Sequence, residues 1–228
     1  MPRIVILGAG AQGRITADLC RDMGLDVAGF LDDTRPAGTD VNGLPVLGGF
    51  SAAWTGSFPD AAFTVALGDP AARSDCFRQI AAAGGALATV VHPRSWVSPS
   101  ARIGVGVVVS PFCYVKANAR VGDFSLLEVG CSVGVDNEIG ESVFLGPSCH
   151  LNAGVVLGDQ VYLGTGTVVI PRRRIGARTI VGAGSTVIHD LPDDVVAAGS
   201  PALIIRGRAA PGEASDPPDA GAARSGSR

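Results

Sequence analysis

An aliphatic residue recurs at every sixth position of this sequence from Val97 to Val187, without a gap. A period of six matches neither the 3.6-residue turn of an α-helix nor the seven-residue repeat of a coiled coil. The stretch is therefore restricted to short elements of six residues each. The repeated residues are Val97, Ile103, Val109, Val115, Val121, Leu127, Val133, Ile139, Leu145, Leu151, Leu157, Leu163, Val169, Ile175, Val181 and Val187.

Short strands joined by tight corners fit this period, with three strands to a coil and each coil stacked on the last. The aliphatic residues would point inward, and small residues, often the glycine that follows them, would form the corners. Cys113, Cys131 and Cys149 are spaced by 18, which places them in one column on successive coils. The chain has no C-x-x-C pair, so we expect small buried side chains and no metal site. Residues 95–205 are predicted to form a parallel β-helix.

The first 94 residues alternate strand and helix patterns instead. Strands are predicted at 4–7, 27–31, 63–67 and 87–91, and helices at 14–23 and 71–83. A glycine-rich turn, Gly8-Ala9-Gly10-Ala11-Gln12-Gly13, separates the first strand from the first helix. This order predicts a small parallel α/β sheet covered by helices.

Composition narrows the range of partners. The chain of 228 residues is 46% hydrophobic and 17% charged with a net charge of -3, so we expect neither nucleic acid nor a membrane surface as a partner. No apolar run approaches 18 residues, and a cytoplasmic protein is expected. Residues 206–228, rich in Ala, Gly, Pro and Ser, are predicted to be a disordered tail.

Several motifs occur in a recognisable order: GAGAQG, FLDD, LGDPAAR, HPRSWVSPSARIG, the hexad repeat and VGAGSTVIHDLPDDVVAAGSPA. Together they resemble the sugar acyltransferases of the sialic acid O-acetyltransferase and bacillosamine/perosamine N-acetyltransferase type. The resemblance implies an α/β half-Rossmann domain followed by a left-handed parallel β-helix. It also implies a homotrimer that uses acetyl-CoA or another acyl-CoA as co-substrate.

In that family the N-terminal domain binds the acceptor, commonly a nucleotide-linked amino sugar. A glycine-rich turn at a helix N-terminus suits one pyrophosphate, and carboxylates at a strand end can accept from ribose or base. Relatives usually have His where this chain has Gln12. The expected acceptor-binding residues are Gly10, Ala11, Gln12, Asp32, Asp33 and Gly68.

The resemblance places acyl-CoA in a groove between neighbouring subunits of the trimer. Pantetheine is a chain of amides, so it needs free backbone partners at coil corners and small residues that let it lie close. The expected CoA-binding residues are Ala153, Gly164, Thr165, Gly166, Gly182, Ala183 and Gly184.

The catalytic position departs from the family pattern. Related enzymes carry a His followed by an acidic residue, and the His takes the proton from the attacking group. In the same phase this chain has Val135, followed by Asp136. Glu128 stands where relatives have Asn, and Phe144 where some have a second His that meets the CoA.

Three interpretations remain open. The chain can be an N-acyltransferase whose amine acceptor needs only a proton acceptor, which Glu128 or Asp136 would provide. Alternatively, His150 is the base. In the third, the chain is a non-catalytic relative that binds a nucleotide sugar or CoA, or scaffolds an assembly.

Overall fold

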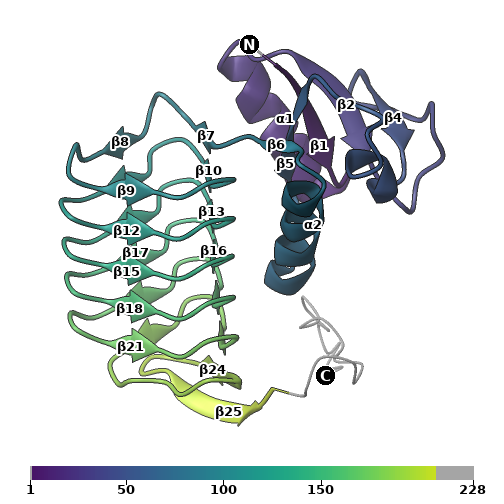
Figure 1. Cartoon of the computed structure of the whole chain (residues 1–228). Coiled ribbons are helices and arrows are strands. Elements are labelled where there is room, and N and C mark those ends of the chain that lie inside the picture. The colour runs from purple at the N-terminus through teal and green to yellow at the C-terminus, as the bar shows by residue number, and fades with distance from the viewer. Residues whose placement is uncertain (1, 209–228) are drawn as a thin grey trace, which may run out of the picture.

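The computed structural model describes residues 2–208, which form an α/β domain beside a β-helix (Figure 1). Most of the expected tail, residues 209–228, lies outside the described residues. The first two residues of that expected tail, Arg206 and Gly207, belong to strand β25 (Leu203–Gly207).

The N-terminal domain is built on a six-stranded sheet in the order β3-β4-β2-β1-β5-β6. All its neighbouring strands are parallel except β3 and β4, which form a hairpin. The parallel α/β domain that the sequence predicts is thereby confirmed. Its elements are β1 (Arg3–Leu7), α1 (Ala11–Asp22), β2 (Val27–Leu31), β3 (Asp40–Val41), β4 (Leu44–Gly48), the 3-10 helix η1 (Phe50–Ala53), β5 (Ala61–Val65), α2 (Pro70–Ala82) and β6 (Ala86–Leu87).

The β3–β4 hairpin is absent from the sequence prediction. Its turn residues, Asn42 and Gly43, have φ angles of 53° and 77°. Asn-Gly is a strong signal for a tight hairpin because both residues tolerate positive φ. The strands on either side are short and one contains Pro45, which hides the alternation that would otherwise mark them.

The glycine-rich turn is held by close packing at Gly13. A Cβ atom added there would lie 1.9 Å from the carbonyl oxygen of Gly8, whereas one added at Gly10 would meet nothing within 4 Å. Gly13→Ala is therefore expected to lower the free energy of unfolding by about 2–3 kcal/mol, and Gly10→Ala by less than about 1 kcal/mol. Urea denaturation of both variants checks this, and equal losses would contradict the packing argument.

The β-helix has three faces of parallel strands, here called sheets I, II and III. Strand residues pair with the residue 18 positions further on, except in the last coil, where Ile180 pairs with Val196. Sheet I also includes the antiparallel strand β25 at its end. Sheet I contains β7 (Val90–Val91), β10 (Val108–Val109), β13 (Leu126–Leu127), β16 (Phe144–Leu145), β19 (Tyr162–Leu163), β22 (Ile180–Val181), β24 (Val195–Ala198) and β25. Sheet II contains β8 (Trp96–Val97), β11 (Tyr114–Val115), β14 (Ser132–Val133), β17 (His150–Leu151), β20 (Val168–Val169) and β23 (Thr186–Val187). Sheet III contains β9 (Arg102–Ile103), β12 (Arg120–Val121), β15 (Glu138–Ile139), β18 (Val156–Leu157) and β21 (Arg174–Ile175).

The prediction of a single strand at 87–91 is wrong, because two short strands occupy this run. Strand β6 pairs with β5 in the N-terminal domain, while β7 pairs with β10 in the β-helix. The apolar run thus supplies one short strand to each domain. Because Val91 lies six residues before Val97, the hexad series begins one repeat earlier than the sequence predicts.

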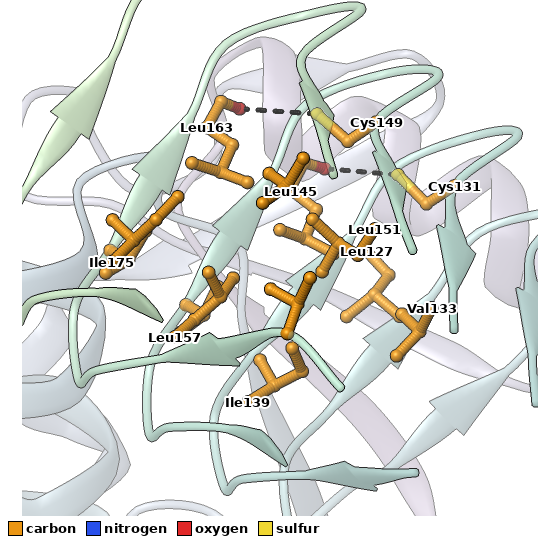
Figure 2. Close-up of a cluster of buried hydrophobic side chains, with 14 of the residues drawn as sticks. Leu127, Cys131, Val133, Ile139, Leu145, Cys149, Leu151, Leu157, Leu163 and Ile175 are labelled. Atoms are coloured by element: carbon orange, nitrogen blue, oxygen red, sulfur yellow. Dashed lines mark hydrogen bonds between the residues drawn. The ribbon is translucent and has the colours of Figure 1, made fainter. Parts of the chain in front are cut away.

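The hexad residues point into the coils and form a continuous core (Figure 2). Cys113, Cys131 and Cys149 lie in one buried column, as the spacing of 18 predicts, and are free thiols. Their sulfurs donate to backbone carbonyls of the next coil, for example Cys131 to Gly146 at 3.2 Å. The column is therefore part of the packing of the β-helix.

Helix α2 joins the two domains through Arg73, whose side chain is almost fully buried. Its guanidinium donates to the carbonyl oxygens of Leu67, Phe124 and Ser142 at 2.7–2.8 Å, and to that of Val143 at 3.2 Å. Burial lowers the pKa of Arg73 to about 10, and the charge of Asp69 opposes that shift. The group is thus charged at neutral pH and is satisfied almost entirely by backbone oxygens.

Candidate active site

A cavity of about 970 Å³ lies between the N-terminal domain and sheet I. All six residues expected to bind the acceptor line it: Gly10, Ala11, Gln12, Asp32, Asp33 and Gly68. They come from the carboxyl ends of β1, β2 and β5, which meet at one edge of the parallel sheet, the usual place for a ligand. The fold brings these residues together on one wall.

The opposite wall is the outer face of sheet I, which the sequence reading did not assign to the acceptor. Phe144, Tyr162, Ile180 and Val196 are cross-strand neighbours in one row, and the row ends at Arg206. The rings of Phe144 and Tyr162 are stacked, with centroids 4.7 Å apart. Part of the signal for this wall was present in the sequence, since Phe144, Tyr162 and Ile180 recur at intervals of 18. The wall is apolar near the N-terminal domain and cationic at its far end, where Arg208 also lines the cavity.

The carboxylate of Asp32 accepts hydrogen bonds from two loops that line the cavity, the glycine-rich turn and the loop after β2. It accepts from the backbone N–H of Ala9 at 2.8 Å, and from the backbone and hydroxyl of Thr34 at 2.9 and 2.6 Å. Burial alone would raise the pKa of Asp32, but these hydrogen bonds and the charge of Arg35 lower it below its ordinary value. Asp33 likewise accepts from the backbone N–H of Phe50 at 2.7 Å. Both carboxylates thus shape the wall of the cavity that the N-terminal domain forms.

Glu128 is the candidate catalytic residue that contacts a residue of the cavity. It follows β13 at the corner between sheets I and II, here called the I–II corner, and is only 5% exposed. Its Oε1 accepts a 2.7 Å hydrogen bond from Nε2 of Gln12, which lines the cavity. A buried carboxylate thus reaches the glycine-rich loop from the β-helix.

Asp136 and His150 lie elsewhere. Asp136 and Val135 form the corner between sheets II and III, here called the II–III corner, where Asp136 has φ 56° and accepts from the Asn118 amide at 3.0 Å. His150 begins β17 on the exposed face of sheet II, directly above Ser132. Within one chain, Glu128 and Asp136 are separated by the whole of β14. The structure therefore does not bring the three candidate proton acceptors together.

The residues expected to bind CoA also divide between these two corners. Ala153 stacks above Val135 at the II–III corner, where the Gly154 N–H donates to the Val135 carbonyl at 2.9 Å. At the I–II corner, the Gly184 N–H donates to the Thr165 carbonyl at 2.8 Å. Among the described residues, the N–H groups of Thr165 and Ala183 have no acceptor, so two coil corners offer backbone donors. The other residues of the I–II set are Gly164, Gly166 and Gly182.

Within residues 2–208, no group of three or more His, Cys, Asp or Glu side chains is arranged to hold a metal ion. None of the helices described there has the length and apolar character needed to cross a membrane.

The fold and the site define a class, the hexapeptide-repeat acyltransferases with an N-terminal α/β domain. Residues 3–80 match the model of the PglD N-terminal domain, and residues 138–171 match that of the bacterial transferase hexapeptide repeats. A search of curated proteins found no match.

Three solved structures are similar to this chain over most of its length. A mutant of perosamine N-acetyltransferase from Caulobacter crescentus, in complex with CoA and GDP-perosamine, is 36% identical, with 90% of this chain and 97% of that chain covered and a TM-score of 0.85. The acetyltransferase domain of PglB from Neisseria gonorrhoeae, in complex with acetyl coenzyme A, is 32% identical, with coverages of 90% and 99% and a TM-score of 0.84. WeeI from Acinetobacter baumannii is 27% identical, with coverages of 89% and 99% and a TM-score of 0.82. The chain belongs to the family of perosamine N-acetyltransferase and the PglB acetyltransferase domain, and its β-helix is the left-handed type of that family.

Proposed function

We propose that the protein transfers an acyl group, most simply acetyl, from acyl-CoA to the amine of a nucleotide-linked amino sugar. The observation that carries the proposal is the cavity between the domains, where the glycine-rich turn faces an apolar wall and Gln12, which lines the cavity, is hydrogen-bonded to the buried Glu128. The turn offers the N-terminus of α1 to a pyrophosphate. The related perosamine N-acetyltransferase is described in complex with CoA and GDP-perosamine, which supports both substrate classes.

Glu128 is our choice of proton acceptor. The ammonium of the acceptor gives one proton to the Glu128 carboxylate, and the neutral amine forms a C–N bond to the thioester carbonyl carbon. The C–S bond breaks with its electron pair on sulfur, and the second amine proton neutralises the CoA thiolate. An amine needs no imidazole to become nucleophilic once it is neutral, which fits Val135 at the usual His position.

A homotrimer would complete the site. If sheet II of each protomer faces the threefold axis, the I–II corner of one protomer meets the II–III corner of its neighbour. Glu128, Thr165 and Ala183 would then face Val135 and Ala153 of the next copy across one groove. This arrangement explains why the expected CoA residues occupy two corners of a single chain.

A cytoplasmic location fits the free cysteines, since disulfides are rare in that compartment.

The exposed face of sheet II supports this packing. Trp96 and Tyr114 are 47% and 43% exposed and lie against each other there, with ring centroids 4.5 Å apart.

Tyr114→Asp is expected to give monomers by light scattering and to abolish thiol release from acetyl-CoA, because a charge would lie in a desolvated interface. Val105→Asp is the control, since Val105 is 50% exposed at the corner between sheets III and I. A trimeric, fully active Tyr114→Asp protein would contradict the packing.

The proposal is tested by measuring thiol release from acetyl-CoA with a panel of UDP-, GDP- and dTDP-linked amino sugars. We expect turnover with at least one acceptor. The second candidate function, a non-catalytic binding or scaffolding relative, is favoured by Val135 at the catalytic position. Tight nucleotide-sugar binding with no turnover for any acceptor would establish that candidate and contradict ours.

A further inference from the structure

Gln12 makes a hydrogen bond from the glycine-rich loop of the N-terminal domain to a residue 116 positions away in the β-helix. It stands in the first turn of α1, and its side chain lines the cavity beside the N-terminus of that helix. The sequence places Gln12 among the acceptor-binding residues. In the structure its side-chain amide instead donates a 2.7 Å hydrogen bond to Glu128, a residue of the β-helix.

The chemistry of the pair fixes its orientation. An ionised carboxylate can only accept hydrogen bonds, so the amide of Gln12 must present its NH₂ group to Glu128. The amide is planar, and its carbonyl oxygen is therefore turned away from Glu128. One carboxylate oxygen of Glu128 is occupied by this bond, and the other remains to accept a proton.

The main chain of Glu128 is already fixed by its coil. The Glu128 N–H donates to the carbonyl of Leu145 at 2.9 Å, and its carbonyl accepts from the Cys113 thiol at 3.1 Å and the Cys131 N–H at 3.3 Å. Only the side chain remains to be positioned. Gln12 is its one hydrogen-bond donor among the described residues. Without this donor, a carboxylate that is only 5% exposed would be left desolvated and free to rotate away.

We infer that Gln12 is a positioning residue that holds the Glu128 carboxylate against the acceptor amine, so that its loss slows the transfer step more than it weakens nucleotide binding. The inference rests on the proposed function. It also accounts for Gln and Glu together at two positions where relatives carry His and Asn, because a Gln–Glu pair fixes the side chain of the proton acceptor from the acceptor-binding domain.

The test compares Gln12→Met, which keeps the length of the side chain but removes the donor, with Glu128→Gln and the double variant. We expect Gln12→Met to lower kcat about 10- to 100-fold, with KM for the nucleotide amino sugar and Kd for the free nucleotide within about threefold of wild type. In the Glu128→Gln background the same change should cost less than about twofold, because the two residues act as one unit. Gln79→Met, on the exposed face of α2, is the matched control and should leave kcat unchanged.

Two results would overturn the inference. The first is a Gln12→Met protein with wild-type kcat. The second is a loss that appears in KM and nucleotide Kd and multiplies with that of Glu128→Gln, which would make Gln12 an independent binding residue. Gln12→Ala repeats the comparison should Gln12→Met fold poorly. A wild-type protein without turnover is a separate result, since it removes the proposed function and the inference together.

Discussion

Glu128→Gln is expected to lower kcat for acetyl transfer about 100- to 1,000-fold, the usual loss when a positioned base is removed. The substitution keeps the size of the side chain, while the amide cannot take a proton from the acceptor ammonium. Glu128 is buried at the I–II corner beside the cavity, so bulk water is a poor substitute. Thiol release measured at saturating acetyl-CoA and acceptor gives kcat directly.

The control for this substitution is Glu138→Gln, because Glu138 is exposed on sheet III and belongs to neither corner of the proposed site. It should leave kcat unchanged. Asp136→Asn and His150→Ala test the two alternatives. A larger loss in either of them than in Glu128→Gln would assign the proton acceptor to that residue and contradict our choice.

Arg73→Met is expected to destabilise the protein by about 3–5 kcal/mol, because several backbone carbonyl oxygens lose their donor at about 1–3 kcal/mol each. The substitution leaves the carbonyl oxygens of Leu67, Phe124 and Ser142 buried without a donor, and each such acceptor carries a desolvation cost. The midpoint of urea denaturation, followed by circular dichroism, measures the effect.

The same variant should weaken nucleotide-sugar binding, since Arg73 holds α2 against the β-helix that forms the other wall of the cavity. Arg78→Met is the control on the same helix. Arg78 is exposed and forms a surface ion pair with Glu141 at 3.2 Å, which contributes at most about 1 kcal/mol. Equal destabilisation by the two substitutions would show that Arg73 does not join the domains as described.

The β-helix was predictable because a gapless period of six leaves few alternatives. The division of residues 87–91 was not, since Leu87 and Val90 belong to one apolar run and only tertiary pairing assigns β6 and β7 to different sheets. Arg73 was also unpredictable. In the sequence Arg73 looks no different from Arg78, which is exposed on the same helix, until the β-helix supplies carbonyl oxygens around it.

The sequence could predict that the six residues expected to bind the acceptor lie on one wall of the cavity, because the ends of parallel strands meet at one edge. It could not choose among the candidate proton acceptors, since Glu128 and Asp136 lie only eight positions apart but occupy opposite ends of β14. Which corners face each other depends on how copies of the chain pack. The contact between Gln12 and Glu128 depends on domain docking, which leaves no periodic signal in the sequence.

The central claim is acyl transfer to an amine without a histidine at position 135. It is tested most directly by mass spectrometry of the products formed from acetyl-CoA and a matched pair of nucleotide sugars, one with an amine and one with a hydroxyl at the same carbon. We predict that the amine compound gains one acetyl group, as an amide, and that the hydroxyl compound is unchanged. Acetylation of the hydroxyl compound at a comparable rate, or of neither compound while both bind, would contradict the account.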